Sequence, residues 1–63
     1  MRNVLESILF TEPDAELRKE TAQALGKTNN IKVLAALEKA RVEDSDKDVR
    51  KAADEAIKQL EGN

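Results

Sequence analysis

Two segments of the chain, DAELRKETAQALG at residues 14–26 and DKDVRKAADEAIK at residues 46–58, follow one pattern. A shift of 32 residues, which carries position 14 to position 46, aligns aspartate with aspartate and arginine with arginine without a gap. The same shift pairs Leu5 with Leu37, Glu6 with Glu38, Phe10 with Val42 and Glu12 with Asp44. Because the matched positions also share their chemistry, we interpret the chain as two copies of one repeat.

Hydrophobic periodicity predicts four helices, over about residues 2–10, 14–27, 31–43 and 46–60. The connections between them are short, and short connections make successive helices pack antiparallel. The inward positions expected in the last three helices are Leu17, Thr21, Ala24 and Leu25, with Thr28 as a possible fifth; Ile31, Leu34, Leu37 and Ala40, with Val33 and Ala36 beside them; and Val49, Ala52, Ala53, Ala56, Ile57 and Leu60. The sequence therefore predicts an all-α fold in a single domain over residues 1–63, built from two helical hairpins.

Polar residues before three of the helices are candidates for N-caps. Asp14 is expected to cap the second helix by accepting a hydrogen bond from a free backbone N–H. Asn29 or Asn30 is expected to cap the third helix. Ser45, with Asp48 three residues later, approximates a capping box for the fourth helix.

The composition removes most catalytic chemistry. The 63 residues include no cysteine and no histidine, so no thiolate or imidazole can act as nucleophile, metal ligand or general base. The acidic run at residues 43–48 lacks the central glycine of a calcium loop and leads directly into a helix, which favours a solvated helix start. We therefore expect a protein that is not an enzyme and that holds no metal and no cofactor.

The charge pattern and the N-terminal segment also limit the partners. The net charge is −2, with both signs spread along the chain and one aromatic residue, which argues against nucleic-acid binding. The apolar residues near the N-terminus are interrupted by Glu6, so they form neither a secretory signal nor a membrane span. The expected partner is another protein, and the expected location is the cytoplasm.

The arginines of the repeat have two interpretations. Arg18 and Arg50 stand four residues after Asp14 and Asp46 respectively, at matched positions. They could form a ladder that binds an anion or a partner. The favoured interpretation is structural, with each arginine spanning a connection and pairing with a cap aspartate or a loop carbonyl.

The segments at residues 14–26 and 46–57 resemble the D-x-x-V-R-x-x-A-x-x-A-L-x-x-L helix of HEAT-like repeats, and are most similar to the short variety found in phycobilin lyases. Thr21 and Asp54 depart from this pattern, because small apolar residues are usual there. The resemblance implies an α-solenoid fragment that serves as a protein-interaction or scaffolding module without catalytic activity. The alternative that it implies is an accessory subunit or fragment of a phycobilin lyase-like enzyme.

A stack of two repeats leaves both of its end faces without a neighbouring repeat, whereas repeat proteins usually need about three units and polar end caps. Val4, Leu9 and Phe10 are apolar positions that such a stack need not cover fully, although Phe10 is interpreted about equally well as a core residue. Together with Arg18 and Arg50, they are the candidate partner-binding residues. Self-association through the open repeat ends is a further hypothesis.

Overall fold

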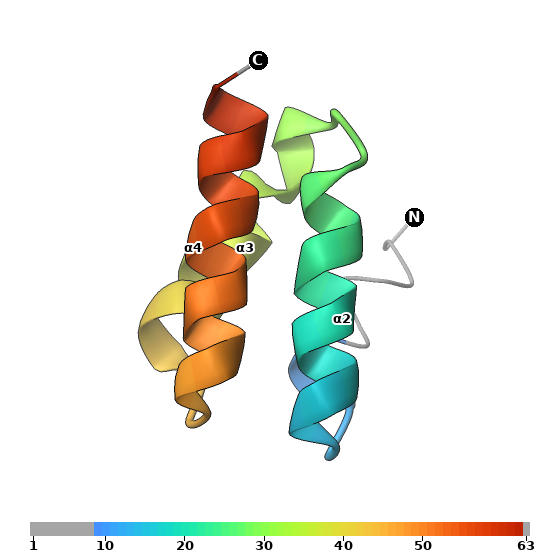
Figure 1. The fold of residues 1–63 in the computed structure, drawn as a ribbon, viewed down its shortest axis with the longest axis vertical. Helices are drawn as coiled ribbons and strands as arrows, with labels where there is room; N and C mark the ends of the chain where they lie inside the picture. Colours follow the sequence, from blue (N-terminus) through green and yellow to red (C-terminus); the bar gives the residue numbers. More distant parts are fainter. Residues whose placement is uncertain (1–8, 63) are drawn as a thin grey trace.

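The computed structural model describes residues 9–62, and within this range the chain forms helices joined by short loops (Figure 1). Residues 9–11 are helical. The elements that follow are α2 (Ala15–Gly26), a 3₁₀ turn η1 (Ile31–Val33), α3 (Leu34–Glu43) and α4 (Lys47–Glu61). The predicted all-α fold is therefore confirmed. The helix predicted over residues 2–10 lies outside the described residues, apart from its last two positions.

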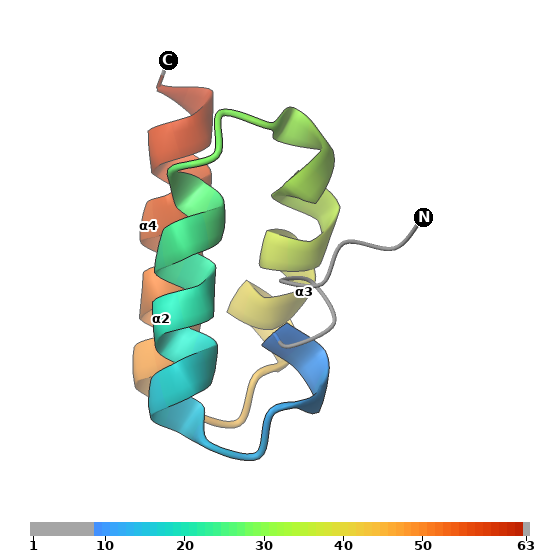
Figure 2. The same ribbon diagram turned by 90° about the vertical axis from the view of Figure 1, so that its right-hand side faces the viewer.

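The helices form two layers. Figure 2 shows α2 and α4 side by side in one layer, while α3 and the helical residues 9–11 form the other. α4 packs against both α2 and α3. α2 and α4 run in the same direction, from the lower end to the upper end of Figure 1. This arrangement, in which matched helices of two hairpins lie parallel in one layer, is that of an α-solenoid fragment. Among the described residues, no helix has the length and apolar content to cross a bilayer.

Aspartates cap both helices of the α2/α4 layer, and they occupy matched positions. The carboxylate of Asp14 accepts a hydrogen bond from the N–H of Glu16 at 2.9 Å, and that of Asp46 accepts one from the N–H of Asp48 at 2.7 Å. The capping box predicted around Ser45 is wrong, because Asp46 holds the extended backbone position directly before the helix. Ser45 lies one residue too early to reach the free N–H groups.

The loop before α3 turns through a left-handed residue. Asn29 has a φ of 58°, a conformation that asparagine tolerates better than most residues. Asn30 then caps η1 by accepting a hydrogen bond from the N–H of Lys32 at 3.0 Å, as one of the two predicted caps. The tight η1 turn leaves Ile31 69% exposed and turns Val33 into the core.

The core lies between the two layers. Its buried apolar residues are Leu9, Ala22, Leu25, Val33, Leu37, Ala40, Val49, Ala52, Ala53, Ala56, Ile57 and Leu60. All six inward positions predicted in α4 are buried, which confirms its stripe. Thr21 is buried as well, and its hydroxyl donates to the carbonyl of Leu17 at 2.8 Å, so the polar group is satisfied.

Four of the predicted core positions are wrong. Leu17 is 44% exposed, Ala24 and Thr28 are exposed, and Ile31 lies outside the core. Ala22 and Gly26 are buried instead of Leu17 and Ala24. The physical reason is that α2 turns this other side toward α4, so positions 17 and 24 face the end of the stack.

Gly26 sets how closely α2 and α4 approach. A Cβ atom at this position would lie 2.7 Å from the Cβ of Ala56 and 2.9 Å from its Cα. The φ of Gly26 is not positive, so the backbone conformation does not itself require glycine. The residue is small because two helices touch there.

Candidate partner-binding site

Arg18, in the first turns of α2, joins the two repeats. Its Nε and Nη2 donate to the two carboxylate oxygens of Asp44, at 3.0 and 3.1 Å, in a bidentate pair. Its Nη1 donates to the carbonyls of Glu12 and Pro13, at 2.9 and 3.1 Å. All three guanidinium nitrogens have internal acceptors. The geometry therefore matches the structural interpretation of Arg18 and leaves its nitrogens little capacity for a partner.

Asp44 is the acceptor at the centre of this junction. Burial would raise the pKa of its carboxyl group, because the charged form loses solvent. Hydrogen bonds from Arg18 and from the N–H of Asp46, at 2.9 Å, together with the charges of Arg18 and Arg50, outweigh burial. The pKa of Asp44 therefore lies below its ordinary value, and the carboxylate stays charged at neutral pH.

Arg50 repeats only part of what Arg18 does. Its Nη1 donates to the carbonyl of Asp44 at 2.6 Å, which is the counterpart of the bond from Arg18 to the carbonyl of Glu12. Each arginine thus fastens the connection that precedes its own helix. Arg18 additionally pairs with the carboxylate of Asp44 in the following repeat. Arg50 lies in the second of the two repeats, and its bond is to the carbonyl of Asp44.

Phe10 and Leu9 have opposite environments. Phe10 is 45% exposed, which decides between its two interpretations in favour of a surface position, but the prediction that Leu9 is left uncovered is wrong. Leu9 is 1% exposed because its side chain enters the core between the layers. Val4 lies outside the described residues. Phe10 is therefore the predicted apolar candidate that the structure places at the surface.

A groove of about 270 Å³ lies beside Phe10. Its lining residues are Leu9, Phe10, Lys39, Ala40, Glu43 and Asp44, so it runs between the end of the first helix and α3. The ammonium group of Lys39 stands 4.9 Å from the centre of the Phe10 ring, at cation–π distance. We call these six residues the Phe10 groove.

Val42 is an exposed apolar residue of α3 outside the Phe10 groove. It is the residue matched to Phe10 by the repeat, and it is 68% exposed. Sequence reasoning did not select Val42 or Lys39 as site residues. The pairing of Phe10 with Val42 was the signal that could have identified Val42, because equivalent positions in stacked repeats face the same side.

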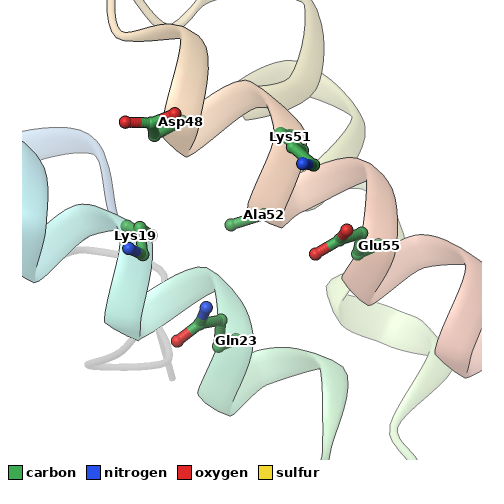
Figure 3. Close-up of a pocket in the computed structure, with 6 residues that line it drawn as sticks. All are labelled: Lys19, Gln23, Asp48, Lys51, Ala52 and Glu55. Carbon is green, nitrogen blue, oxygen red and sulfur yellow. The ribbon is translucent and has the colours of Figure 1, made fainter.

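A second groove, on the other layer, is polar. Figure 3 shows Lys19 and Gln23 of α2 opposite Asp48, Lys51 and Glu55 of α4, with both signs of charge interspersed. Lys19 also lies 3.6 Å from Glu16, so its charge is balanced within its own helix. Within residues 9–62, no group of acidic side chains is arranged to hold a metal ion. The mixture of charges favours a solvated surface over a specific anion site.

A family model described as HEAT repeats matches residues 2–61, which is nearly the whole chain. No curated protein and no solved structure matches the chain.

Proposed function

Because the chain belongs to the HEAT-repeat family, we propose that it is a protein-interaction or scaffolding module without catalytic activity of its own. Stacked helical hairpins form an extended surface on each layer, and proteins of this architecture use such surfaces to bind partners. The observation that carries the proposal is the Phe10 groove, in which a half-exposed aromatic ring stands beside an apolar floor.

The dimensions of the Phe10 groove favour a protein partner. The groove measures about 270 Å³ and three of its six lining residues are charged, so it differs from the mostly apolar pockets typical of small-molecule and cofactor sites. A hollow of this size suits one or two side chains from a partner. Aromatic residues at such sites contribute a large share of binding energy, because they bury much apolar area with few rotamers to fix.

The charges around the groove indicate what the partner presents. Lys39 and Glu43 lie on one face of α3 and line the groove together with Ala40. A partner segment with an apolar side chain flanked by charged residues would fill the groove and pair with these two side chains. Val42 would add apolar contact beside them.

The test compares two matched variants as baits for proteins in a cell extract. Phe10→Ser removes the ring from the groove. Ile31→Ser removes an apolar side chain that is even more exposed but lies in η1, before the start of α3, and does not line the groove. A partner of the groove is retained by the wild type and by Ile31→Ser, and is lost from Phe10→Ser. If every retained protein binds Phe10→Ser equally well, the groove is not the binding site.

The alternative role, as an accessory to a phycobilin lyase-like enzyme, rests on sequence resemblance. Incubation of the chain with a bilin and its apoprotein separates the two hypotheses. An interaction module leaves the rate of pigment attachment unchanged, whereas a lyase component accelerates it.

A further inference from the structure

The two ends of the repeat stack carry different chemistry. α2 turns the buried Ala22 and Gly26 toward α4. The matched positions in α4 hold Asp54 and Lys58, which form an ion pair at 3.1 Å with side chains 40% and 74% exposed. At the C-terminal end of the stack, charged side chains therefore occupy the positions that hold small residues in the first repeat. A polar outer face of this kind is typical of a capping repeat.

The opposite end of the α2/α4 layer is less polar. Leu17, Glu20 and Ala24 are spaced at three and four residues, so they share one side of α2, and all three are exposed. We call these residues the leading face. The matched residues in α4 are all buried: Val49, Ala52 and Ala56. The leading face is thus the side of a repeat that is normally covered by a preceding helix.

The contact between α2 and α4 gives the register in which such a helix would lie. Gly26 touches Ala56, and the helices run in the same direction, so one turn earlier Ala22 faces Ala52. At the start of the contact, Arg18 holds the carboxylate of Asp44. In this contact α4 and its preceding loop present Ala56, Ala52 and Asp44 to α2. The equivalent residues of the first repeat, 32 positions earlier, are Ala24, Glu20 and Glu12, and they would contact a helix that packs on the leading face.

Glu12 is prepared for the same role as Asp44. Its carboxylate accepts a hydrogen bond from the N–H of Asp14 at 3.2 Å, just as the carboxylate of Asp44 accepts one from the N–H of Asp46 at 2.9 Å. Both carboxylates are therefore turned into the loop in the same way. Between Glu12 and Ala24, the first repeat has Glu20 where the second repeat has Ala52, so a basic side chain of the partner would pair with Glu20.

We propose that the leading face binds a helix of a partner protein that presents an arginine, a second basic residue and a glycine at positions i, i+4 and i+8. The arginine pairs with Glu12, the second basic residue with Glu20, and the glycine permits close contact with Ala24. This surface is separate from the Phe10 groove, so it extends the proposed function to a second partner site.

A second copy of the chain does not have this chemistry at its C-terminal end. In α4, the residues at positions i, i+4 and i+8 of the proposed partner pattern are Arg50, Asp54 and Lys58. In a head-to-tail stack, Asp54 would face Glu20 of the next copy, and like charges repel. Lys58 would stand where only glycine allows the helices to touch. The hypothesis of self-association through the repeat ends is therefore disfavoured for this form of stacking.

The test builds the proposed partner pattern into α4 of the full chain. Arg50 already supplies the arginine, Asp54→Lys adds the second basic residue and Lys58→Gly adds the glycine. One molecule then carries both the partner pattern and the leading face. Head-to-tail contacts of this kind do not close, so chains of molecules form. In sedimentation velocity over a concentration series, we expect a monomeric wild type and a double variant whose weight-average mass at least doubles. Adding Leu17→Glu is expected to return the double variant to a monomer.

Circular dichroism of each variant checks that the helices persist. Since glycine weakens helices, Asp54→Lys with Lys58→Ala serves as a second variant that keeps helix propensity and is expected to associate more weakly. Monomeric behaviour of both folded variants would overturn the proposal, as would association that survives Leu17→Glu. Wild-type association that Leu17→Glu abolishes would make a second copy the occupant and would overturn it too. None of these results depends on Phe10.

Discussion

Replacing Gly26 by alanine sets two opposing effects against each other. Alanine is the better helix former, and at an interior position the change from glycine gains about 1 kcal/mol. Gly26 is the last residue of α2, so this gain is an upper limit. Its backbone conformation suits alanine, because its φ is not positive. On propensity alone, Gly26→Ala would stabilise the protein.

Packing reverses that expectation. The added Cβ would lie 2.7 Å from the Cβ of Ala56 and 2.9 Å from its Cα, whereas ordinary contact begins at 3.4 Å. Because one of these atoms belongs to the backbone, α2 and α4 must move apart. Overpacking of this kind costs about 1–3 kcal/mol. After the full gain in propensity is subtracted, we expect a net loss of about 0–2 kcal/mol.

The loss is measured by urea unfolding followed by far-ultraviolet circular dichroism. A core of this size supplies only about 3–5 kcal/mol, so the unfolding midpoint should fall. Ala24→Gly is the matched control, because Ala24 is exposed on the same helix and its substitution reports propensity without packing. If Gly26→Ala is as stable as the wild type or more stable, α2 and α4 do not approach as closely as described, and the register inferred for the leading face loses its basis.

Three further outcomes follow from the junction, the core and the caps. Since the pKa of Asp44 is lowered by folding, its stabilisation is complete above its ordinary value of 3.8 and is lost as the pH falls below it. Asp44→Asn should therefore unfold less steeply with acid than the wild type in a pH titration of stability. Leu37→Ala should cost about 2–5 kcal/mol and leave much of the chain unfolded in thermal melts, whereas Ile31→Ala, at an exposed position, should change stability by less than about 0.5 kcal/mol. Asp46→Ala should cost about 0.5–2 kcal/mol and Ser45→Ala almost nothing, by urea unfolding, because only Asp46 caps α4.

The candidate site was predictable only in part. From the sequence, Phe10 near the end of an apolar helix was as compatible with the core as with the surface, and the structure leaves it 45% exposed. Leu9, its neighbour, is buried instead, because the direction of a side chain depends on where α3 and α4 lie. Lys39 came to the groove through the packing of α3 beside Phe10, and sequence spacing across two repeats does not encode that distance.

The sequence by itself determined the helices, their order and the repeat. The bounds of α2 and α4 lie within one residue of those predicted, and the whole apolar stripe of α4 is buried, because helical periodicity and capping are local properties of the chain. The tertiary structure alone decided which side of α2 is covered. Leu17 and Ala22 are both apolar and both lie on that helix, but only Ala22 is small enough to sit beside Gly26 where α4 approaches. The choice between them is made by contact between two helices, which no single helix can specify.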